Sequence, residues 1–151
     1  MPNYVYSGFH VTGEREEIDR FAKLMFKTVP TVETEYTKPL RPFETIMDFG
    51  AIIPPPDSMK NGIHEWWAVE NWGTKWTGFD VDVWDYPDGS LHFQFTTAWD
   101  FPTPVLEAIA AEFPALVFDG SAYEEDNAFQ YTGQFNGDNS WGPGQIEFIT
   151  I

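Results

Sequence analysis

Hydrophobic and polar residues alternate most regularly on either side of the sequence Pro87-Asp88-Gly89. A proline and a glycine around an aspartate are typical of a tight turn, so residues 79–86 and 90–97 are predicted to form a β-hairpin. Because alternate residues of a strand face opposite sides of a sheet, one side of this hairpin should be buried and the other wet. The apolar side consists of Phe79, Val81, Val83, Leu91, Phe93 and Phe95, and the polar side of Asp80, Asp82, His92 and Gln94.

Two other segments show the period of an amphipathic helix. In residues 14–27, apolar side chains recur at intervals of three and four, and glutamates precede them where the helix dipole favours anions. In residues 103–113, Thr103 is the predicted N-cap, and prolines stand in the first turn and directly after the last. The apolar stripe of the first helix is Ile18, Phe21, Ala22 and Met25.

The remaining apolar segments predict strands. They are residues 4–11, 46–53, 116–123 and 129–135. Taken in order with the helices and the hairpin, they form a split β-α-β arrangement with a mainly antiparallel sheet and both helices on one face. We therefore predict an α+β fold, a ferredoxin-like sandwich in one domain over residues 1–151, with an insertion at about 28–78 and a C-terminal loop at about 136–151.

The charge of the chain is strongly uneven. The net charge is -16, and all 8 lysine and arginine residues precede Trp76. The charged side chains of residues 76–151 are therefore all acidic if histidine is counted as neutral. A field of that sign repels phosphate backbones and attracts basic surfaces, so direct nucleic-acid binding is not expected. The alternative that we keep open is that the acidity serves only solubility.

Residues 65–76 contain four of the seven tryptophans, in a segment that is predicted to be partly helical from His64 to Glu70 and to turn at Gly73. Aromatic rings, one cation and one amide can together hold a flat ligand such as a nucleobase. The alternative is that the tryptophans are core or turn anchors and that Lys75 pairs with Glu70 or Asp80. The candidate ligand-binding residues are Trp66, Asn71, Trp72, Lys75, Trp76 and Trp99.

Catalytic and metal-binding patterns find little support. The chain has no cysteine, no Gly-x-Ser-x-Gly motif and no glycine-rich phosphate loop, so we predict no enzymatic activity, no metal and no cofactor. A hydrolase that uses Glu70 with Asp80 or Asp100 remains an alternative. The spacing of His64, Glu65, His92, Asp80 and Asp82 matches no metal-binding motif, and the two aspartates are better explained as a solvated strand face.

Several short strings resemble one known family in the same order. They are Met1-Pro2-Asn3, Ile-Ile-Pro-Pro-Pro at 52–56, Glu-Asn-Trp-Gly-Thr-Lys-Trp at 70–76, Phe-Thr-Thr-Ala-Trp at 95–99 and Phe-Pro-Ala-Leu at 113–116. The chain thereby resembles the YubB-like proteins of phages, prophages and plasmids, although Tyr4 and Val5 stand where members more often have Trp and Cys. The resemblance implies a ferredoxin-like domain and a mobile-element origin.

Two functions follow as hypotheses. In the first, the chain is a phage accessory protein of the host cytoplasm that inhibits or modulates a basic host protein, one of host defence or one that binds nucleic acid. In the second, it sequesters a nucleotide-like small molecule at the tryptophans. No segment reaches the length of about 20 apolar residues that spans a membrane, and no basic and apolar leader is evident. The candidate partner-binding residues are Asp80, Asp82, Asp85, Asp88, Asp119, Glu124, Glu125 and Asp126.

Overall fold

The computed structural model describes residues 3–31, 40–126, 128–135 and 141–143. Among these residues the main sheet has six strands in the order β4-β5-β1-β6-β7-β8, and every neighbouring pair is antiparallel. The strands are β1 (Tyr4–Thr12), β4 (Phe79–Asp85), β5 (Leu91–Ala98), β6 (Val117–Glu124), β7 (Gln130–Phe135) and β8 (Trp141–Pro143).

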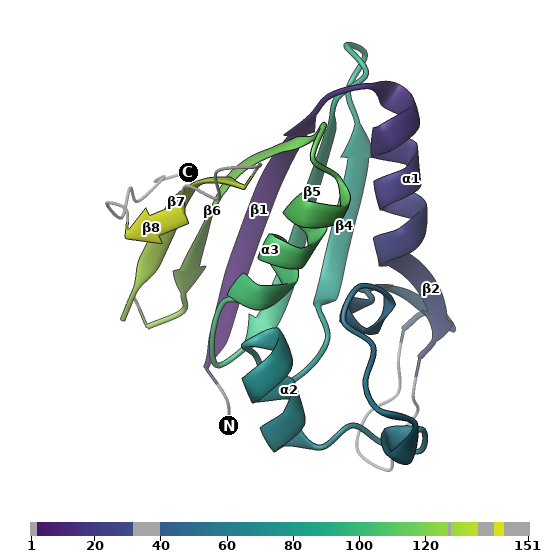
Figure 1. Ribbon diagram of the computed structural model, residues 1–151, viewed down its shortest axis with the longest axis vertical. Coiled ribbons are helices and arrows are strands. Elements are labelled where there is room, and N and C mark those ends of the chain that lie inside the picture. The colour runs from purple at the N-terminus through teal and green to yellow at the C-terminus, as the bar shows by residue number, and fades with distance from the viewer. Residues whose placement is uncertain (1–2, 32–39, 127, 136–140, 144–151) are drawn as a thin grey trace.

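Two helices cover one face of this sheet. Figure 1 shows α1 (Arg15–Met25) and α3 (Thr103–Glu112) on the same side of the strands. The chain order β1-α1-β4-β5-α3-β6, with β1 between β5 and β6, is the split β-α-β arrangement predicted from the sequence. The ferredoxin-like α+β fold is therefore confirmed.

A segment of about 50 residues between α1 and β4 forms its own small layer. It contains a two-stranded sheet of β2 (Phe26–Pro30) and β3 (Phe43–Met47), two 3-10 turns, η1 (Phe49–Ala51) and η2 (Asp57–Met59), and the helix α2 (Glu65–Trp72). β2 was not predicted, because residues 28–42, with three prolines and mixed charges, are typical of a surface connection. The first helix was also predicted to reach residue 27, whereas the backbone is already extended at Phe26.

The predicted strand 46–53 is only partly correct. The strand ends at Met47, and η1 follows because Phe49 turns inward to pack edge-on against Trp72 and Phe95, with ring centroids 5.8 and 6.2 Å apart. The apolar run is thus buried by a turn rather than by a longer strand.

The core lies between the sheet and its two helices and is largely phenylalanine. Phe93 is fully buried, as predicted, and its ring lies within 5.5 Å of those of Phe9, Phe21 and Phe26. Val83 was also predicted to be buried under the helices, but 38% of it is exposed. Val83 pairs with Phe93 and lies on the same face of the sheet. Because β4 is an edge strand, Val83 is left uncovered on one side.

The C-terminal part departs from the predicted loop in one respect. Residues 141–143 form β8 and pair with 131–133 of β7, which adds a sixth strand to the sheet. The rest of the predicted loop, 136–140 and 144–151, lies outside the described residues.

Candidate functional site

The tryptophan segment, residues 65–76, begins with a structural anchor. Trp72 is 2% exposed, donates its indole N–H to the Ile53 carbonyl at 2.9 Å, and packs edge-on against Trp67. Gly73 ends α2 in the left-handed conformation (φ +80°), where an added Cβ would lie 2.9 Å from Pro104. The predicted turn at Gly73 is confirmed, and Trp72 belongs to the core.

Lys75 is held between two exposed rings. Its ammonium lies 4.8 Å from the centroid of Trp76 and 4.6 Å from that of Trp99, and 3.2 Å from the Glu65 carboxylate. The prediction that Lys75 would pair with Glu70 or Asp80 is wrong. The carboxylate that α2 directs to this cation is that of Glu65. With only 15% of the side chain exposed, Lys75 already has a carboxylate and two π faces as partners.

The structure brings together three of the six predicted ligand-binding residues. Trp72, Lys75 and Trp76 line a pocket of about 580 Å³. Trp66 and Asn71 lie apart from this pocket: Trp66 is exposed and stacks on His64, and the Asn71 amide donates to the Trp67 carbonyl at 2.9 Å. Trp99 does not line this pocket, but its ring contacts the ammonium of Lys75, which does. The other lining residues are Ile46, Asp48, Gly50, Pro55, Ile63 and Thr77.

Glu124 corrects the predicted acidic surface. It is 2% exposed, and its Oε2 accepts hydrogen bonds from the backbone N–H groups of Asp126 and Ala128 at 3.1 and 2.9 Å. The residue faces the helix side of β6, opposite Val5 of β1, because the alternation of the strand places it there. Glu124 therefore stabilises the turn after β6 and is not available to a partner.

Four of the other predicted acidic residues are exposed but already have hydrogen-bond partners. Asp85 forms a 2.9 Å ion pair with Arg15, and Asp88 accepts from the Ser90 backbone N–H at 2.9 Å. Glu125 accepts from the Tyr4 N–H at 2.9 Å, and Asp126 from the Asn3 amide at 3.0 Å. Asp85 lies on the helix side of the hairpin, because it pairs with the buried Leu91.

The side of the sheet that α1 and α3 leave uncovered, called the open face here, carries the remaining acidic residues. Asp82 and Asp119 are exposed on it. Asp82 of β4 lies in the cross-strand row of Gly8, and Asp119 of β6 lies in the adjacent row of His10. None of β1, β4, β5, β6 and β7 contains a lysine or an arginine. The open face therefore presents carboxylates without a strand-borne cation to neutralise them.

Aromatic side chains that were not predicted as site residues lie on the same face as these carboxylates. Tyr6 and Tyr123 lie in register with ring centroids 5.5 Å apart, and 37% and 48% of these residues are exposed. Trp84, 38% exposed, stacks on His92 at 4.6 Å. The signal in the sequence was the alternation of tyrosine and histidine in β1, but only the strand order shows that β6 lies beside it.

A groove of about 380 Å³ crosses the open face between two such aromatic rows. Its floor is the row in which Gly8 lies between Gln94 and Ser121 in the register of the sheet. One wall is formed by Tyr6 and Tyr123 and the other includes the imidazole of His92. The lining residues are Tyr6, Ser7, Gly8, Asp80, His92, Gln94, Phe95, Thr96, Ser121 and Tyr123.

Two titratable side chains of the groove have shifted pKa values. Burial raises the pKa of the Tyr6 hydroxyl, and the nearby Glu125 carboxylate raises it further. Burial also lowers the pKa of the His92 imidazole, and His10 lowers it further. His92 is therefore neutral at pH 7 and does not oppose a bound cation.

This shift predicts a pH dependence of stability. Because the folded state disfavours the imidazolium form of His92, the free energy of unfolding should fall as the pH decreases from about 6.5 through the lower folded pKa. Above about 6.5 this residue contributes no pH dependence. Urea unfolding at several pH values should show a smaller loss at acid pH in His92→Gln than in the parent protein; equal losses would contradict the assignment.

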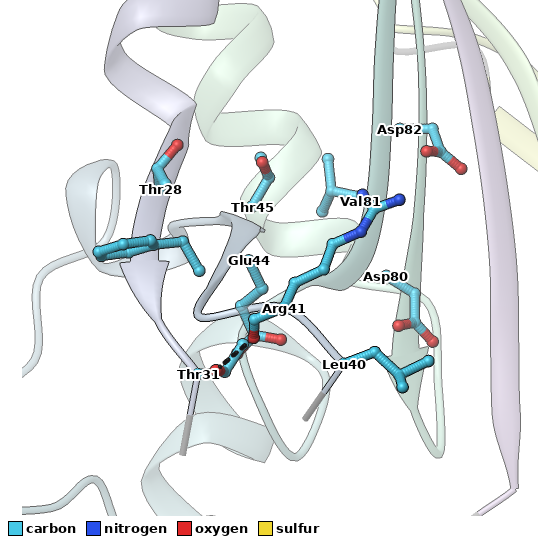
Figure 2. Close-up of a pocket in the computed structure, with 10 residues that line it drawn as sticks. Thr28, Thr31, Leu40, Arg41, Glu44, Thr45, Asp80, Val81 and Asp82 are labelled. Atoms are coloured by element: carbon cyan, nitrogen blue, oxygen red, sulfur yellow. Dashed lines mark hydrogen bonds between the residues drawn. The ribbon is translucent and has the colours of Figure 1, made fainter. Parts of the chain in front are cut away.

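A second depression, of about 650 Å³, lies between β4 and the β2–β3 hairpin (Figure 2). Val81 points toward Thr45 of β3, whereas Asp80 and Asp82 extend from the other side of β4. Arg41 extends from the hairpin toward β4, and its carbonyl accepts a 2.7 Å hydrogen bond from the Thr31 hydroxyl. Because Thr31 and Leu40, which line the depression, are the last described residues before and after a gap in the described sequence, the open face is the better-defined site.

The residues weighed for catalysis come from three separate parts of the fold. Glu70 is exposed on α2, Asp80 stands at an irregularity of β4 with a φ of +50°, and Asp100 precedes α3. Burial raises the pKa of the Asp100 carboxyl, while its hydrogen bond from the Phe101 N–H at 2.7 Å lowers it. Within the described ranges, no three His, Asp or Glu side chains gather as a metal site.

About half of the chain matches one family of known proteins. Residues 71–142 match the model of a family described as the ferredoxin-like domain in Api92-like protein. The match begins in the last turn of α2 and ends in β8, so it includes most of the open face and no part of β1 or α1. No curated protein and no solved structure matches the chain. In the part of the chain that the structure describes, no helix is long and apolar enough to cross a membrane.

Proposed function

We propose that this chain is a binding protein without catalytic activity, which attaches to a basic protein through the open face of its sheet. The observation that carries the proposal is that β1, β4, β5, β6 and β7 contain no lysine or arginine, while this face exposes Asp82, Asp119 and a set of aromatic rings. Aromatic side chains supply contact area and affinity, and carboxylates steer a basic partner and accelerate its association.

The biological setting that fits this proposal is an accessory protein of a phage or another mobile element. The acidic open face would bind a basic surface of a host protein, one of host defence or one that binds nucleic acid, and thereby compete with the phosphates of its usual ligand. The resemblance of its short sequence strings to the YubB-like proteins favours this setting, whereas the match over residues 71–142 adds a ferredoxin-like domain and names no origin.

Two double variants with equal charge changes test the proposal. The variant Asp82→Lys/Asp119→Lys reverses two exposed charges on the open face. The control Glu16→Lys/Glu107→Lys reverses two exposed charges on the helices α1 and α3. Any effect of net charge alone is the same in both proteins.

The measurement is partner affinity. Immobilised protein is incubated with a bacterial lysate, and a captured protein with a basic surface is purified and titrated against each variant at several salt concentrations. We expect the open-face variant to lose at least about tenfold in affinity and the helix variant to keep most of it. Equal losses in both variants, or none in either, would contradict the proposal.

The pocket beside Trp72, Lys75 and Trp76 favours a second candidate function, the binding of a small flat molecule. It is supported by the volume of about 580 Å³ and by the exposed ring of Trp76. Because the Lys75 ammonium already contacts Glu65 and two rings, this pocket offers less charge to an anionic ligand than the sequence suggests. Native mass spectrometry of protein purified from its host distinguishes a co-purifying small molecule from a protein partner.

A further inference from the structure

The groove on the open face has the shape of a site for a flat group. Gly8 adds no side chain to its floor, and the side chains of Gln94 and His92 lie over this position, 3.4 and 3.6 Å from where a Cβ would be. The tyrosine wall, Tyr6 with Tyr123, and the histidine wall stand on either side of this floor. A planar group that enters between the two walls would therefore lie against the Gln94 and His92 side chains and beside the tyrosine rings.

The polar side chains of the groove can all accept hydrogen bonds, and the carboxylate of Asp80 can only accept them. Asp80 contributes a carboxylate, Gln94 an amide oxygen, and Ser121 and the tyrosines contribute hydroxyl oxygens. Asp82 extends the same row at the β4 edge, where it pairs with Gln94. A ligand that matches this set carries a positive charge and several donors in one plane.

We infer that this groove holds the guanidinium group of an arginine side chain of the basic partner. The inference rests on the proposed function and adds the identity of the residue that is recognised. Arginine presents five N–H donors in a planar fork and stacks on aromatic faces, whereas the ammonium of lysine is a strongly hydrated point charge. The groove therefore selects arginine over lysine.

Other flat ligands fit the charge less well. A nucleobase could also stack on Tyr6 and Tyr123, but its phosphate would approach Asp80 and Asp82 in a protein with a net charge of -16. Arg15, a cation of this chain that lies near the hairpin turn, is engaged with Asp85 at 2.9 Å and with the Gly89 carbonyl at 3.2 Å. It is therefore not free to fill the groove.

Three synthetic peptides test the inference directly. They are identical except at one central residue, which is arginine, lysine or citrulline; citrulline keeps the planar shape of arginine without its charge. Each is titrated into isotopically labelled protein, and the shifts of the Gly8 and Ser121 amide signals and of the Trp84 indole N–H signal are followed. The arginine peptide is expected to saturate these signals with a dissociation constant at least about tenfold below that of the lysine peptide. Citrulline should bind least.

Variants of the protein identify the groove as the site. Tyr123→Ala and Asp80→Asn should each weaken the arginine peptide about tenfold. Asparagine tolerates the positive φ of residue 80, so Asp80→Asn keeps the test valid if Tyr123→Ala fails to fold. The control Trp66→Ala removes an exposed ring on α2, 60% accessible against 48% for Tyr123, and should leave the dissociation constant unchanged.

The outcomes separate the inference from the proposed function. Equal binding of the lysine peptide, shifts confined to residues outside the groove, saturation by uridine monophosphate in place of the arginine peptide, or no saturable binding of the arginine peptide would each overturn the arginine site. The open-face double variant tests the proposed function separately, through the affinity of the whole partner.

Discussion

Replacement of Glu124 by lysine is expected to destabilise the protein by about 3 to 5 kcal/mol. The substitution removes the acceptor of two backbone N–H groups, those of Asp126 and Ala128, and places an ammonium group where the carboxylate is 2% exposed. The unpaired charge at a buried position and the two lost hydrogen bonds together account for this magnitude. Urea unfolding monitored by circular dichroism measures the loss.

Glu125→Lys is the matched control. It makes the same charge change at the next residue, which is exposed and accepts only the Tyr4 N–H. We expect it to cost no more than about 1 kcal/mol. If the two lysine variants are equally stable, Glu124 does not have the buried role assigned to it.

Phe93→Ala is expected to cost about 3 to 5 kcal/mol, because it leaves a cavity at the centre of the core. The Phe93 ring contacts rings from β1, α1 and β2, so no single neighbour can move to fill the space. The same unfolding measurement applies.

Val83→Ala is the control for Phe93→Ala. Val83 pairs with Phe93 across β4 and β5 and shares its face, but it is 38% exposed at the sheet edge. Its truncation should cost about 1 kcal/mol or less. Comparable losses in the two variants would show that β4 is packed more tightly than the structure indicates.

The parts of the fold that the sequence predicted are those with a strong local pattern. The hairpin around Pro87-Asp88-Gly89 and the helices α1 and α3 follow from periodicity and from turn and capping residues. β2 was missed because its short, polar sequence has no such pattern, and its strand partner, β3, is a separate segment of the chain.

The candidate site was harder to predict, because it depends on long-range contacts. Lys75 contacts Trp99 because its backbone N–H donates to the carbonyl of Ala98, the last residue of β5, at 3.3 Å, and Trp99 is the next residue. Glu124 belongs to an acidic run that is typical of a surface, and only the alternation of β6 against β1 shows that it faces inward. The open face likewise requires the strand order, which places Tyr6 beside Tyr123.

The central claim is that a partner covers the open face, and hydroxyl-radical footprinting of the complex with the captured, purified partner measures this directly. Aromatic side chains with comparable exposure lie on the open face and on α2, so the extent of their oxidation can be compared within one experiment. We expect the partner to protect Tyr6, Trp84 and Tyr123 and to leave Trp66 as reactive as in the free protein. Protection of Trp66 with unchanged oxidation of Tyr6, Trp84 and Tyr123 would contradict the claim.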